Sequence, residues 1–146
     1  MSDTQLPVLD HTIQQTNLWL KKLMVGHHFQ TRHDAYSALR AVLHALRDRL
    51  TPDQAVHFGA QLPILVRGIY YEGWHLAGKP TDDRQVNEFI QRVAAEFPPQ
   101  FPRDALAVTQ AVFDLLFQEI DPGETAKIID TLPVPLRILW PSAAQR

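Results

Sequence analysis

One short run of residues holds most of the side chains in this sequence that could recognise a ligand or a partner. The chain reads Arg-Gly-Ile-Tyr-Tyr-Glu-Gly-Trp over 67–74, which places a guanidinium, a carboxylate and three aromatic rings close together. Tyrosine, tryptophan and arginine dominate binding surfaces because they combine large rigid area with polar groups. The run therefore predicts a ligand-binding or partner-binding site formed by Arg67, Tyr70, Tyr71, Glu72 and Trp74.

The same aromatic residues also fit a structural role. In that interpretation Tyr70 fills a seam inside the fold, while Tyr71 and Trp74 cover the ends of helices. The sequence leaves both interpretations open.

The histidines do not form a recognisable metal site. A metal ion needs about three converging ligands, and the neighbours His27 and His28 point about 100° apart on a helix. His44 and His57 are expected to face solvent, because the repeat described below pairs them with polar residues. The chain also has no cysteine, glycine-rich phosphate loop, HExxH motif or nucleophile elbow. We therefore expect no catalytic residue, no metal ligand and no cofactor.

An internal repeat shows which elements must position these residues. Aligned with itself at an offset of 70 residues, the chain matches 15–70 with 85–140 without a gap and with twelve identical pairs. Ordinary composition would give about three or four identities. Because Arg67 recurs as Arg137, both are expected to support the repeated fold, through a salt bridge or through carbonyl groups at a helix end. Asp34 recurs as Asp104, and its position suits an N-cap or a first-turn acid.

Each copy of the repeat predicts four helices. In the first copy they are expected at about 10–25, 34–50, 52–62 and 64–71, with counterparts about 70 residues later. Asp10 is expected to cap the first helix, and Thr51-Pro52-Asp53-Gln54 has the pattern of a capping box. Charged runs at 47–49 and 82–83 are interpreted as a solvated helix face and a helix start. No window alternates like a strand, so the predicted fold is all-α.

The two copies define the expected domain organisation. Residues 8–78 form the first helical repeat and residues 79–146 the second, packed together as one domain. Their connection at Gly78-Lys79-Pro80 is too short to act as a flexible tether.

Composition excludes several classes of protein. The formal net charge is −2 with scattered basic residues, so a nucleic-acid partner is not expected. No stretch reaches the ~18 apolar residues of a membrane span, and the N-terminus does not resemble a signal peptide. Without cysteine the chain suits a reducing compartment, so we expect a cytoplasmic protein with no membrane partner. Self-association through an exposed apolar helix face stays open.

The sequence resembles a bacterial family catalogued as domain of unknown function 2267. The resemblance rests on 38–55, on Ala60-Gln-Leu-Pro, on Val66-Arg-Gly-Ile-Tyr-Tyr-Glu-Gly-Trp and on the second-half segments Leu132-Pro133 and 136–141. It covers about Asn17 to Pro141 and implies a small, helical, soluble bacterial protein. The family implies no catalytic residues.

These observations favour a non-enzymatic cytoplasmic binding or interaction module that uses the segment Arg67–Trp74 to bind an unidentified protein or small molecule. The alternative is an enzyme or a small-molecule or cofactor binder with a site in the cleft between the two repeats. Ligand sites at domain junctions are common, which supports that alternative.

Overall fold

The computed structural model describes residues 4–27 and 29–144, and every regular element in this part of the chain is a helix. The predicted all-α class is therefore confirmed for these residues. In chain order the elements are α1 (Pro7–His27), α2 (Arg32–Arg49), α3 (Pro52–Gly59), α4 (Ile64–Tyr71), α5 (Val86–Ala95), α6 (Ala105–Glu119), α7 (Pro122–Thr131) and the 3₁₀ helices η1 (Val134–Leu139) and η2 (Ser142–Ala144).

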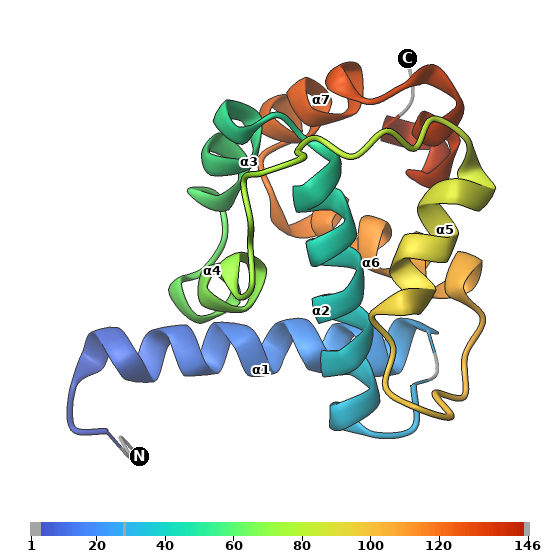
Figure 1. Cartoon of the computed structure of the whole chain (residues 1–146). Helices are drawn as coiled ribbons and strands as arrows, with labels where there is room; N and C mark the ends of the chain where they lie inside the picture. Colours follow the sequence, from blue (N-terminus) through green and yellow to red (C-terminus); the bar gives the residue numbers. More distant parts are fainter. Residues whose placement is uncertain (1–3, 28, 145–146) are drawn as a thin grey trace.

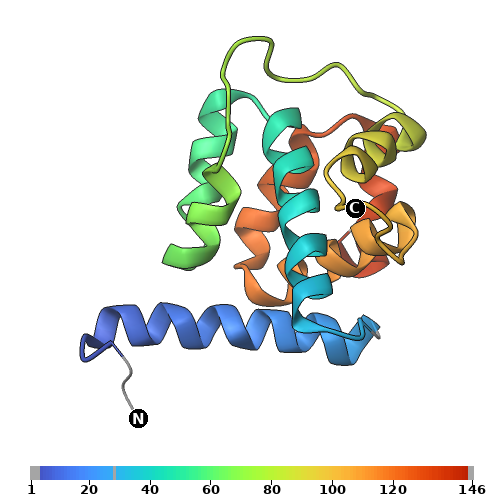
Figure 2. The ribbon, with the colours of Figure 1, turned by 60° about the horizontal axis from the view of Figure 1, so that its bottom comes forward.

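Helix α2 is the centre of the molecule. Figure 1 shows α1 along one side and α2 rising from it, with α3 and α4 to one side of α2 and α5 to the other. Helix α2 contacts α1, α4, α5 and α6, and α3 contacts α7 at the end away from α1. In Figure 2 as well, α4 lies on one side of α2 and α5 on the other. A helix covered by four others has little surface left for solvent.

Local sequence signals explain most helix boundaries. The Thr51 hydroxyl oxygen accepts from the Gln54 amide, and the Gln54 side-chain oxygen accepts from the Thr51 amide, so the predicted capping box of α3 is confirmed. Asp104 caps α6 through the Ala107 amide, as predicted. In the first half Thr31 is the N-cap of α2, and Asp34 lies in its first turn.

Two boundary predictions are wrong. Helix α1 starts at Pro7, so Asp10 lies in its first turn and receives bonds from the amide and hydroxyl of Thr4 instead of capping the helix. The charged pair at 82–83 does not begin α5, because Glu88 accepts from the Gln85 amide at that start. Asp83 is instead buried and ion-paired with Arg92.

The expected solvated face of α2 is also wrong. Arg47 and His44 are 4% and 3% exposed, although Asp48 and Arg49 keep some contact with solvent. The reason is tertiary, because α4 and α5 pack over the side of α2 that carries these side chains. Their polar groups therefore need partners inside the protein.

The segment between α4 and α5 crosses the end of α2. The Thr81 amide donates to the Asp48 carbonyl at 2.8 Å, and Arg49 Nε donates to the Asp83 carbonyl at 2.6 Å. The Lys79–Pro80 peptide bond in this segment is cis. These bonds hold the connecting segment against α2.

Candidate functional site

The carbonyl groups at the C-terminus of α4 accept hydrogen bonds from nearby amides and from side chains of α2. The last four carbonyl groups of a helix have no partner within the helix. Here Gly68 accepts from the Glu72 amide and Tyr71 from the Trp74 amide. The Ile69 carbonyl lies 2.7 Å from His44 Nε2, and Arg47 Nη1 donates to the Tyr70 carbonyl at 2.8 Å. Side chains of α2 therefore complete the cap of α4.

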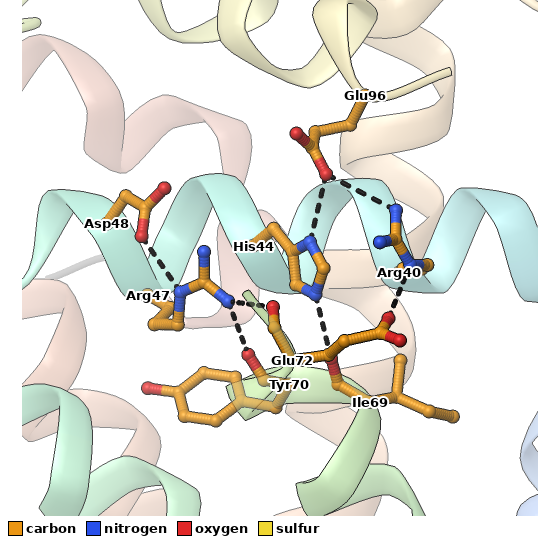
Figure 3. A network of polar contacts seen from close by, with 8 residues as sticks. All are labelled: Arg40, His44, Arg47, Asp48, Ile69, Tyr70, Glu72 and Glu96. Atoms are coloured by element: carbon orange, nitrogen blue, oxygen red, sulfur yellow. Dashed lines mark hydrogen bonds and ion pairs between the residues drawn. The ribbon is translucent and has the colours of Figure 1, made fainter. Parts of the chain in front are cut away.

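His44 links this cap to the second half of the chain. Its Nε2 must carry a proton, because the Ile69 carbonyl can only accept. Its Nδ1 lies 2.9 Å from Glu96 Oε1, at the end of α5. Figure 3 shows the imidazole ring between Ile69 below and Glu96 above.

Arg40 joins two carboxylates above this buried layer. Its Nε lies 3.0 Å from Glu72 Oε1 and its Nη1 lies 3.4 Å from Glu96 Oε1. Among the described residues, no side chain or amide bonds to Oε2 of either glutamate. Arg40, Glu72 and Glu96 are partly exposed, with side-chain exposures of 33%, 59% and 39%. Each carboxylate therefore keeps one oxygen available to a ligand.

These charged groups border a surface hollow of about 370 Å³. It is open to solvent and lies where α2, the end of α4 and the segment after α5 meet. The rings of His33 and Tyr36 form one wall, stacked with centroids 6.3 Å apart. The lining residues are His33, Tyr36, Ser37, Arg40, Glu72, Glu96 and Pro98.

The predicted site residues are divided: Tyr70, Tyr71 and Trp74 pack on one another, while Arg67 bonds to backbone carbonyls and Glu72 borders the hollow. Arg67 donates from Nε to the Gly59 carbonyl and from Nη2 to the Leu62 carbonyl, each at 3.0 Å. Arg137 makes the matching contacts with the carbonyls of Leu132 and Asp130. The predicted tethering of helix-end carbonyls by both arginines is confirmed.

Tyr70 is buried, and its hydroxyl donates to the Ala55 carbonyl at 2.7 Å. Burial, reinforced by the neighbouring Tyr71, raises the pKa of the Tyr70 hydroxyl far above its ordinary value. Tyr71 and Trp74 are half-buried and pack with ring centroids 5.5 Å apart. Glu72 alone of the five reaches the hollow.

The sequence contained a signal for the missed residues. Arg40, His44 and Arg47 are spaced i, i+4 and i+7, so they form one polar stripe along α2. This stripe lies beside buried apolar residues of the same helix, among them Leu39, Val42 and Leu43. A polar stripe on a helix with apolar residues on most other sides indicates that the polar side chains are buried and bonded to other protein groups, and do not face solvent.

A second hollow includes Gln110 and Ser142, which stand 70 residues after Arg40 and Glu72 of the first. It measures about 360 Å³ and is lined by Gln110, Asp114, Ile138, Leu139, Trp140, Pro141 and Ser142. At the 70-residue offset, Gln110 stands for Arg40, Asp114 for His44 and Ser142 for Glu72. The cluster of arginine and two glutamates is therefore found in only one of these two hollows.

In residues 4–27 and 29–144, no group of three or more His, Asp or Glu side chains could hold a metal ion. The predictions for His28 and for the side chain of His27 lie outside the described groups. No helix in the described part of the chain has the length and apolar character needed to cross a membrane.

Comparison with known protein families finds a family that matches most of the chain. A family model described as an uncharacterised conserved protein, DUF2267, matches residues 16–139. No curated protein matches the chain.

Proposed function

The chain belongs to the uncharacterised DUF2267 family, and from that premise we propose that it is a non-enzymatic binding protein whose ligand site is the hollow beside Arg40. The ligand is a small molecule with a cationic amine or guanidinium group. The observation that carries the proposal is the pair of carboxylates, Glu72 and Glu96, that border the hollow with one unbonded oxygen each.

The chemistry of the walls supports a cationic ligand. Ionised donors form the stronger hydrogen bonds to carboxylate oxygens, and a cation is also attracted to the face of an aromatic ring. Glu72 and Glu96 supply the carboxylates, and Tyr36 supplies the ring. Arg40 already contacts Oε1 of both carboxylates from the inner side, so their unbonded Oε2 atoms suit a second guanidinium or ammonium group further out.

The buried layer supports binding more than catalysis. A general acid or base must reach the reacting group within hydrogen-bond distance. His44 is enclosed, and both of its ring nitrogens are already engaged by Glu96 and by a carbonyl group. Its role is to position Glu96. An enzyme with a site between the halves stays the alternative, with His33 as the exposed imidazole at the hollow.

Two further parts of this proposal concern origin and setting. We propose that residues 8–78 and 79–146 are duplicated units packed as one domain. In the two halves, α1 corresponds to α5 and α2 corresponds to α6. In support, α1 contacts α6 and, correspondingly, α5 contacts α2. The two hollows and the matching contacts of Arg67 and Arg137 add to this. The cytoplasm is the proposed location, because the chain has no cysteine.

The test measures binding of butylamine, agmatine and acetate by NMR titration of the ¹⁵N-labelled protein. The amines should shift the resonances of Tyr36, Ser37 and Glu72, and acetate should not. Glu72→Gln should weaken agmatine binding by about tenfold, because one charge-assisted hydrogen bond becomes a neutral one. Glu72 is exposed, so the substitution should leave stability unchanged.

The matched control is Ser142→Ala, at the equivalent position of the second hollow. It should leave agmatine binding unchanged. Amine shifts that are equally strong in Glu72→Gln, or shifts confined to the region of Ser142, would contradict the proposed site. Binding of acetate in place of the amines would keep the site and overturn the ligand class.

A further inference from the structure

The first turns of α1 expose an apolar stripe that continues the core. Farther along the helix, the side facing the core is buried at Thr12, Thr16, Trp19, Leu20 and Leu23. Val8 and Leu9 precede Thr12 by four and three residues, so they lie on the same side of the helix. They are nevertheless 51% and 45% exposed. Figures 1 and 2 both show these turns extending past α4.

The start of α4 extends this apolar surface. The Leu65 amide donates to the Thr12 hydroxyl at 2.9 Å, which fixes the first turn of α4 beside the exposed end of the stripe. Six aliphatic side chains, each between 41% and 54% exposed, make up what we call the α1–α4 patch: Leu6, Val8, Leu9, Ile13, Ile64 and Leu65.

We propose that the α1–α4 patch is a self-association surface, covered in solution by the same patch of a second copy of this chain. Six half-exposed aliphatic side chains amount to about 300–400 Å² of apolar surface, the size of patches that are often functional. Two copies would bury roughly twice that area. Because apolar atoms supply about 60% of an interface, the total comes to roughly 1,200 Å², the lower limit for a specific complex.

The charges around the patch favour a second copy over other occupants. Residues 6–18 contain no lysine or arginine, so the α1 part of the patch lacks the basic side chains that hold amphipathic helices on anionic membranes. Their one acidic residue, Asp10, already accepts two bonds from Thr4. A partner therefore needs only an aliphatic face of similar size, and the patch itself provides one.

Two-fold symmetry makes the arrangement self-complementary. In such an interface each contact is made twice. The projecting turns of α1 in one copy would cover the start of α4 in the other, and the reverse contact would cover the first copy. The α1 part and the α4 part of the patch are then buried in both copies. No part of the patch stays exposed to bind a third copy, so the assembly stops at a dimer.

Sedimentation velocity tests the proposal from about 10 µM to about 1 mM, the range expected for a small interface. The mass should rise with concentration from 16.7 kDa toward twice that value. Leu9→Lys should weaken the dimer at least tenfold. Val134→Lys is the matched control, because Val134 is 67% exposed outside the patch, and it should have no effect. Circular dichroism checks that each variant folds.

Single cysteines give a second measurement, since the natural chain has none. An equimolar mixture of Leu9→Cys and Leu65→Cys should form disulfide-linked dimers under mild oxidation, because α1 of one copy faces α4 of the other, and a mixture of Leu9→Cys and Val134→Cys should not. A wild-type chain that stays monomeric to about 1 mM would overturn the proposal. A dimer whose stability Leu9→Lys does not change would also overturn it. The same holds if the wild-type chain is a monomer that binds phosphatidylcholine vesicles and Leu9→Lys abolishes that binding.

Discussion

Arg47→Met should destabilise the fold far more than a change on a solvated helix face. Arg47 Nη1 donates to the carbonyls of Tyr70 and Glu72 at 2.8 and 2.9 Å, and the arginine side chain is 4% exposed. Methionine keeps much of the apolar contact but has no donor. Each carbonyl left without a partner in a buried site costs about 1–3 kcal/mol.

Part of that cost is recovered because a buried guanidinium no longer needs to be desolvated. The free energy of unfolding should therefore fall by about 2–4 kcal/mol. For a chain of this size that corresponds to a decrease in Tm of about 5–15 °C. Urea unfolding followed by circular dichroism measures the change, and the m-value should stay constant because the surface exposed on unfolding is unchanged.

Arg32→Met is the matched control, since Arg32 lies exposed in the first turn of the same helix. Surface substitutions of this kind change stability by about 0.5 kcal/mol or less. If Arg47→Met also stays within that limit, Arg47 does not cap α4, and the polar layer beneath the hollow has no structural role. A large loss for both variants would point to helix propensity or charge instead.

Three smaller perturbations test other parts of the structure. Tyr70→Phe removes the hydroxyl donor to a backbone carbonyl of α3 and should cost about 1 kcal/mol in urea unfolding. Gly59→Ala should destabilise the protein although alanine favours helices, because the new Cβ would collide with the Tyr71 hydroxyl and lie 2.8 Å from the Tyr71 ring. Adding Tyr71→Leu to Gly59→Ala should restore part of the lost stability. The hydrogen bond from His57 lowers the pKa of Glu124 below the ordinary 4.5, so Glu124 stabilises the fold above that pH and loses this effect as the pH falls through the lower value. Thermal unfolding of Glu124→Gln should therefore differ most from wild type above pH 4.5 and converge with it in more acidic solution.

Short-range sequence signals predicted the helices well. The Thr51–Gln54 capping box and the prolines at 52 and 63 act on their own neighbouring backbone, so their effect hardly depends on the rest of the fold. Of the two tethers predicted for Arg67, the one to helix-end carbonyls is also confirmed, and its partners lie within eight residues of it along the chain.

The candidate site could not be predicted in the same way. Glu96 reaches His44 across 52 positions of sequence, and Glu72 reaches Arg40 across 32. No local pattern states that such residues meet. The burial of His44 and Arg47 likewise depends on α4 and α5 packing over α2, which only the assembled fold decides.

The sequence by itself determined the helical class, most helix boundaries and the residues that hold those boundaries, because propensity, capping and apolar periodicity act over a few residues. Only the tertiary structure decided which polar residues are buried, which carboxylates converge on the hollow and which apolar turns of α1 stay uncovered. These properties follow from how helices pack, and packing joins side chains that are remote in sequence. The aromatic run over 67–74 illustrates both levels, since local pattern marked it and packing turned Tyr70 inward and Glu72 toward the hollow.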